Sequence, residues 1–132
     1  MQSIHLRERV KIMKFRSIFI GFMGTLGVVM AFAGLVAPET ALGETGLSIV
    51  ILSNLRAFMA AEVMMALFAL YSLKNKQYQD AALIFLLITL IGWTIGQATS
   101  YVVDGAPNTF TTVSILLQAA LIPVTWAALK KK

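Results

Sequence analysis

The sequence contains no cysteine and a single histidine, His5, in a basic N-terminal segment. The missing cysteines exclude disulfides, thiolate metal ligands and thiol-attached haem. A transition-metal site needs several histidine, cysteine or carboxylate ligands that converge on one point, and the sequence shows no such cluster. We therefore expect no metal and no other cofactor.

Charge is also scarce. Only 13% of the 132 residues are charged, whereas 58% are hydrophobic and the mean hydropathy is +0.81. An ordinary soluble domain is about half apolar and a quarter charged. Because so little polar surface could not cover a soluble protein of this size, we expect the lipid bilayer to be its solvent and first partner.

Four apolar runs are each long enough for a transmembrane helix, which needs about 20 residues. Short connections between them force neighbouring helices to run antiparallel. The sequence therefore predicts an all-α integral membrane protein, an antiparallel up-down four-helix transmembrane bundle over residues 17–129. The predicted spans cover about residues 17–37, 47–73, 81–103 and 109–129, between a basic segment (1–16) and a basic tail (130–132).

The distribution of cations predicts the orientation. Of the eleven lysines and arginines, all except Arg56 fall before the first run, between the second and third, or after the fourth. The alternate connections carry Glu39, Glu44 and Asp104 instead. The positive-inside rule then places both termini in the cytoplasm, and we expect a bacterial inner membrane. The sequence has no basic patch interleaved with aromatic residues, so we expect no nucleic acid partner.

Small residues recur at helical spacing in the first and third runs. In lipid, helices associate through close packing of small residues rather than through a hydrophobic driving force. We interpret these residues as packing seams, either within the bundle or in a homo-oligomer or a larger membrane complex. They are Gly21, Gly24, Gly27, Ala31 and Gly34 in the first run, within an arc of about 140°, and Gly92 and Gly96 in the third.

Two ionisable residues interrupt the second run, and each costs about 2.5–3.5 kcal/mol in hydrocarbon. Arg56 lies about 13 Å below the outer end, so its long side chain can reach upward. Glu62 lies about 18 Å from the inner end, near the midplane, and Asn54 widens its polar sector. We expect Glu62 to be either a protonated carboxyl bonded to a backbone carbonyl or a proton-coupling carboxylate.

The third run offers polar partners on one face, where Gln97, Ser100 and Asp104 recur at i, i+3 and i+7. We predict that these three residues and Arg56 form a polar cluster in the outer half of the membrane. Arg56 forms an ion pair with Asp104 there, and Glu39 and Glu44 of the outer loop are competing partners for Arg56. One interpretation is a buried network that fixes helix register. The other is a small pocket, open to the outer face, for a polar or anionic headgroup.

Two segments carry a family resemblance: "NLRAFMAAEVMMALFAL" in the second run and "GQATSYVVDGAPN" after the third. The chain resembles a bacterial four-helix membrane family catalogued as a domain of unknown function, over roughly residues 14–130. The characteristic motifs match Leu55-Arg56-Ala57-Phe58 and Ser100 with Asp104-Gly105-Ala106-Pro107. Gln97 replaces a frequent arginine, and Ala60 and Ala61 replace frequent glycines. A looser similarity to DoxX-like proteins rests on architecture.

No nucleophile–base pair, metal site or phosphate loop is recognisable, so we expect no enzymatic activity. The first hypothesis is a structural or accessory membrane subunit that packs through its small-residue seams around the Arg56 cluster. The alternative is a protein that binds or transports a lipid or small molecule with Arg56 and Glu62.

Overall fold

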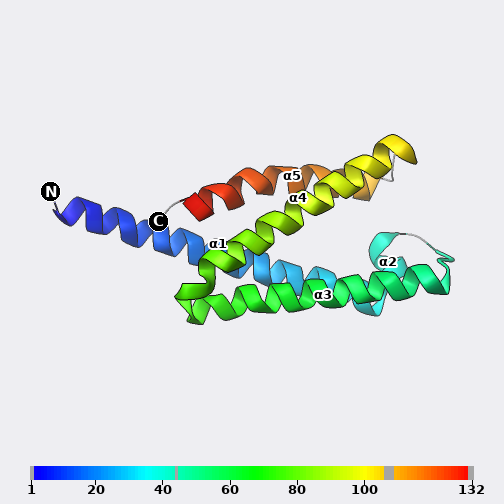
Figure 1. Ribbon diagram of the computed structural model, residues 1–132, viewed down its shortest axis with the longest axis horizontal. Helices are drawn as coiled ribbons and strands as arrows, with labels where there is room; N and C mark the ends of the chain where they lie inside the picture. Colours follow the sequence, from blue (N-terminus) through cyan, green and yellow to red (C-terminus); the bar gives the residue numbers. More distant parts are fainter. Residues whose placement is uncertain (1, 44, 106–108, 131–132) are drawn as a thin grey trace. The chain divides into compact units, whose positions relative to one another are not determined.

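The computed structural model describes residues 2–43, 45–105 and 109–130. Each of its four long helices contains a stretch long and apolar enough to cross a membrane. The predicted all-α class with four membrane-length helices is therefore confirmed. The long helices are α1 (Gln2–Val36), α3 (Ile49–Lys74), α4 (Gln79–Val103) and α5 (Thr109–Lys130), joined in part by the short helices α2 (Pro38–Leu42) and η1 (Lys76–Tyr78) (Figure 1).

Helix α1 begins well before the predicted first span. Its 35 residues extend over about 52 Å, whereas the hydrocarbon core is about 30 Å thick. The basic segment therefore continues into the membrane as one uninterrupted helix, which the sequence analysis did not predict. Helix α2 was not predicted either. It starts at Pro38, where a missing N–H is harmless, and ends at Gly43 in the left-handed conformation, φ 69°.

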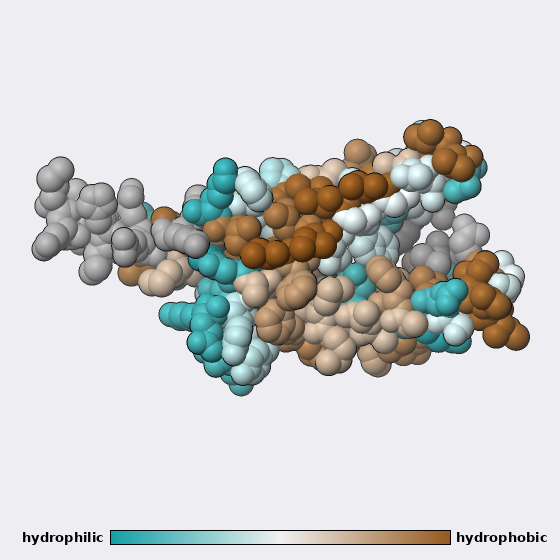
Figure 2. Space-filling model, viewed as in Figure 1, coloured by the Kyte–Doolittle hydropathy of each residue, from teal (hydrophilic) through white to brown (hydrophobic). Residues whose placement is uncertain are grey.

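The chain divides into two compact units. The α1–α3 unit is Ile20–Gln79, and the α4–α5 unit is Met1–Phe19 with Asp80–Lys132. Both units expose large apolar side chains along their helices, for example Ile49 and Val102 at 85% and 83% exposure. Figure 2 shows the resulting hydrophobic surface over the helices. Water-soluble proteins rarely expose such continuous apolar surface, whereas lipid accommodates it.

Within the α1–α3 unit, the glycines of α1 lie directly against α3. A Cβ at Gly27 would lie 3.0 Å from the Cβ of Ala66, a short side chain that cannot rotate away. A larger residue at position 27 would therefore have to push the two backbones slightly apart, and glycine favours their close approach. The other close pairs are Gly24 with Leu70 (2.8 Å to Cδ2) and Gly34 with Met59 (2.9 Å to Sδ), and Ala31 is buried in the same unit.

Hydroxyl groups inside the apolar helices are satisfied locally. Four of them donate a hydrogen bond to a backbone carbonyl one turn earlier in the same helix, which pairs the hydroxyl hydrogen where no water is near. The donors include Ser72 to Ala69 (2.6 Å), Thr94 to Leu90 (2.7 Å) and Thr125 to Leu121 (2.8 Å). Ser72 and Thr125 are completely buried.

An ion pair joins α1 to α4 in the α4–α5 unit. Arg16 Nη2 donates to Asp80 Oδ1, and the Arg16 side chain is only 11% exposed. The pair lies at the predicted inner end, where Arg16 precedes the first apolar run and Asp80 precedes the third. Sequence reasoning missed it, although both residues stand at the same predicted side of the bilayer.

We expect Gly27→Ala to destabilise the protein by about 1–3 kcal/mol, because the new Cβ overpacks the contact with Ala66. The matched control is Gly92→Ala in α4. No described atom lies within 4 Å of a Cβ there, so the better helix propensity of alanine should leave stability unchanged or slightly raised. Thermal melts in detergent provide the measurement. Equal melting temperatures for the two variants would contradict close packing of α1 against α3 at Gly27.

Candidate functional site

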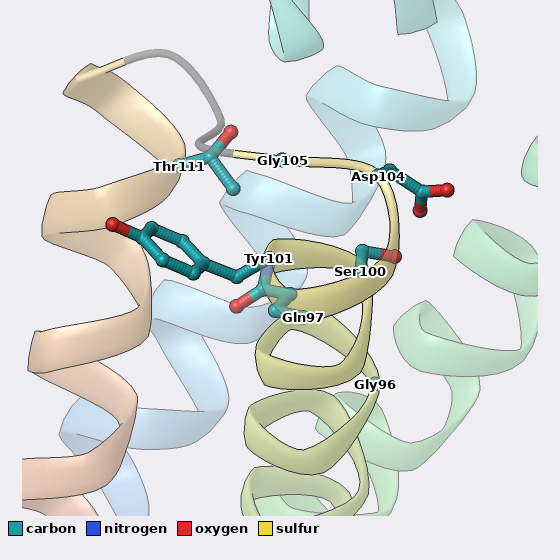
Figure 3. Close-up of a pocket in the computed structure, with 7 residues that line it drawn as sticks. All are labelled: Gly96, Gln97, Ser100, Tyr101, Asp104, Gly105 and Thr111. Atoms are coloured by element: carbon teal, nitrogen blue, oxygen red, sulfur yellow. The ribbon is translucent and has the colours of Figure 1, made fainter.

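A pocket lined mainly by residues with polar side chains, the polar pocket, lies in the α4–α5 unit where α4 ends. Its volume is about 370 Å³, and three of the residues predicted to form the polar cluster, Gln97, Ser100 and Asp104, line it. Its other lining residues are Gly96, Tyr101, Gly105 and Thr111 (Figure 3).

Helix geometry brings these residues together. Gln97, Ser100 and Asp104 share one face of α4, and the amide of Asp104 donates to the Ser100 carbonyl at 2.7 Å in the last turn. Gly105 then adopts φ 100°, which favours glycine, and redirects the chain. The turn brings the first residues of α5 back beside the last residues of α4, so Thr111 completes the wall.

The pocket has two sides with different character. In Figure 3 the Tyr101 ring extends toward α5, on the same side as Thr111, whereas the Ser100 hydroxyl and the Asp104 carboxylate point the other way. Ser100, Tyr101 and Asp104 are all exposed, so a molecule from outside can reach them. Gln97 lies deeper, and its buried Oε1 has no hydrogen-bond partner among the described residues.

The chemistry of the lining is that of hydrogen bonding. The described lining residues offer three hydroxyls, one amide and one carboxylate, and none of them is a lysine, arginine or histidine. Gln97 Oε1 is an acceptor that needs a donor, because a buried acceptor left unpaired is costly. A hydroxyl or amine group in the pocket could supply that donor. Among the described residues, no three histidine, cysteine or acidic side chains converge in a way that could hold a metal ion.

A second, apolar pocket of about 310 Å³ shares one wall with the first. Tyr101 lines both, and no polar surface lines the second pocket. Its other residues come from α4 and α5, namely Ala98, Val102, Thr112, Ile115 and Leu116. A cavity lined by several polar side chains and an apolar cavity therefore share Tyr101 on their walls.

The remaining predicted residues lie in the α1–α3 unit. Asn54 and Arg56 are exposed on α3, and Glu62 is half-buried. Glu39, a predicted competitor for Arg56, instead accepts hydrogen bonds through Oε1 from the amides of Gly46 and Leu47, both at 3.1 Å. The Arg56–Asp104 pair, which would join the two units, stays a prediction, and so do both roles of Glu62.

Parts of other predictions lie outside the described residues: Glu44, Ala106 and Pro107 of the D-G-x-P motif, and Lys131 and Lys132 of the tail. Sequence reasoning also missed residues that the structure does describe. Thr111 was not singled out because the periodicity of α4 cannot reveal a wall supplied by α5. The short turn between the two helices was the available signal, since it places the start of α5 beside the end of α4.

Swapping the charges tests the predicted ion pair. We expect Arg56→Asp alone to lower the melting temperature, because an acid would then face Asp104. The double variant Arg56→Asp/Asp104→Arg should recover stability, with a coupling of about 0.5–3 kcal/mol between the two positions. Thermal melts of the single and double variants measure this coupling. Purely additive losses would show that the two side chains do not pair.

The sequence and structure of the chain were compared with those of known proteins. No curated protein and no solved structure matches it. One family model, DUF4345, described as a domain of unknown function, matches residues 15–129. That range includes the second and third apolar helical stretches completely, most of the first and fourth, and both pockets. The chain therefore belongs to the DUF4345 family of domains of unknown function.

Proposed function

We propose that this protein is a non-enzymatic integral membrane protein that binds one amphipathic, lipid-like molecule at the end of α4. The ligand headgroup occupies the polar pocket, and its apolar chain lies in the adjoining apolar pocket. The observation that carries the proposal is the position of Tyr101, which lines both cavities. Tyrosine suits such a boundary, because its ring is apolar and its hydroxyl is a hydrogen-bonding group.

The lining favours a particular headgroup. Among the described lining residues Asp104 is the one carboxylate and none is a cation, so a neutral or amine-bearing headgroup fits better than an anionic one. Gln97 Oε1 adds an acceptor that such a donor group satisfies. Recognition by Arg56 of an anionic headgroup, which the sequence suggested, requires the Arg56 side chain to reach this pocket.

The cellular location belongs to the same proposal. We place the protein in a bacterial inner membrane with both termini in the cytoplasm, which puts the pocket at the outer face. The support is the separation of charges along the sequence: the cations flank one set of helix ends, and Glu39, Glu44 and Asp104 lie at the other. The ligand then comes from the outer leaflet.

Two glycines of α4 provide a matched test of ligand binding. Gly96 lines the polar pocket, whereas Gly92, one turn earlier on the same face, does not. We expect Gly96→Leu to fill the pocket and lower ligand occupancy about tenfold or more, and Gly92→Leu to retain the ligand. Native mass spectrometry of protein extracted with its surrounding lipid measures how many amphipathic molecules each chain holds.

Ser100→Ala provides a milder variant that removes one hydroxyl from the pocket without adding bulk. We expect it to lower occupancy by less than Gly96→Leu. A wild-type chain that holds no stoichiometric amphipathic molecule would contradict the proposal. So would a Gly96→Leu chain that is folded and holds as much ligand as the wild type.

A second candidate is an accessory subunit that docks another membrane protein. The observation that favours it is the open small-residue face of α4, where no described atom lies within 4 Å of a Cβ at Gly92 or Gly96. Small residues at four-residue spacing allow another helix to approach closely. In this case Gly92→Leu should lose a stoichiometric protein partner during mild purification. A wild-type preparation without any such partner would exclude the subunit role.

A further inference from the structure

The opposite end of the α4–α5 unit carries a cationic surface that the proposed function does not use. In α1, Arg16 is neutralised by Asp80, but Lys11 and Lys14 are exposed and form no ion pair with a described residue. Three residues apart, they lie on the same side of the helix. At the end of α5, Lys130 is exposed as well.

The face of α1 that carries these lysines changes from cationic to apolar within one helical turn. Ile18 follows Lys14 by four residues on the same face and is 71% exposed. An exposed face that passes from cationic to apolar matches the boundary between the headgroup layer and the hydrocarbon. Nucleic acid or a soluble acidic protein would satisfy the lysines but leave Ile18 in water.

Helix α5 shows the same boundary independently. Lys130 Nζ lies 4.9 Å from the centre of the Trp126 ring, and Trp126 is 48% exposed. An exposed tryptophan beside a lysine at the end of an apolar helix is typical of a residue at the headgroup level. Both helices therefore place a lysine directly beyond an apolar surface, in the same compact unit.

We propose that Lys14, with Lys11 beside it on α1, and Lys130 on α5 bind the phosphates of anionic phospholipid headgroups at the membrane surface. The acyl chains of these lipids lie against the exposed apolar side chains next to the lysines, Ile18 on α1 and Trp126 on α5. The ammonium groups act as point charges that attract the phosphate, and an anionic leaflet supplies the lipid at high local concentration. This surface is independent of the pocket at the other end of α4.

Trp126 provides a reporter beside the proposed site. The chain has two tryptophans, so Trp93→Phe leaves Trp126 as the sole tryptophan, and excitation at the red edge of tryptophan absorption avoids the tyrosines. The full-length protein is reconstituted in phosphatidylcholine vesicles that contain a small fraction of brominated phosphatidylglycerol or, separately, brominated phosphatidylcholine. We expect brominated phosphatidylglycerol to quench Trp126 more strongly, and the ratio of the two quenching efficiencies reports the preference for the anionic lipid.

Paired lysine variants identify which charges matter. We expect Lys14→Gln/Lys130→Gln to reduce the preference by about fivefold for each lysine removed, and Lys14→Arg/Lys130→Arg to retain it. The control Lys74→Gln/Lys76→Gln removes the same charge from exposed positions of the α1–α3 unit and should leave the ratio unchanged. Helicity by circular dichroism shows that each variant is folded.

Three results would overturn the proposal. The first is equal quenching of Trp126 by the two brominated lipids. The second is an equal loss in the Lys74/Lys76 control, which would indicate net charge rather than this surface. The third is loss of the preference on adding inorganic phosphate at constant ionic strength, which would indicate a site for a free anion instead of a lipid.

Discussion

The close backbone contact between α1 and α3 illustrates the constraint on which the structure depends. Lipid is as apolar as the side chains, so burial of leucine or isoleucine gives helices no reason to associate in a bilayer. Gly27 lies against Ala66, and Gly24 and Gly34 lie against Leu70 and Met59, because close van der Waals packing must replace the hydrophobic driving force. The large apolar residues are correspondingly left on the outer surfaces of the helices.

The same solvent decides where polar groups can lie. Hydroxyls within the apolar stretches, such as those of Thr94 and Thr125, donate to the preceding turn of their own helix. Apart from Arg56 and Glu62 within α3, the charged and strongly polar groups discussed above lie toward helix ends, where water or headgroups are near. Arg16 pairs with Asp80 at one end of α4, and the polar pocket around Gln97 lies toward the other. The two proposed lipid contacts follow this division.

The sequence predicted the elements better than the contacts. Apolar runs of about 20 residues have few alternative structures, so the four long helices and the all-α class could be predicted. The periodicity of α4 also placed Gln97, Ser100 and Asp104 on one face, and all three line one pocket. Three features could not be predicted, because they depend on how separate segments are placed and not on the residue pattern of one helix. They are the pocket wall formed by Thr111, the Arg16–Asp80 ion pair, and the hydrogen bonds that Glu39 accepts from the amides of Gly46 and Leu47.

The central claim is that the four apolar helices cross a bilayer, with the lysine-rich ends on one side and the pocket on the other. Because the chain lacks cysteine, single cysteines report topology without background. Thr45→Cys and Thr109→Cys should react with a membrane-impermeant maleimide in intact cells. Lys11→Cys and Gln77→Cys should react only after permeabilisation. Labelling of residues 45 and 77 from the same side of the membrane would contradict the account.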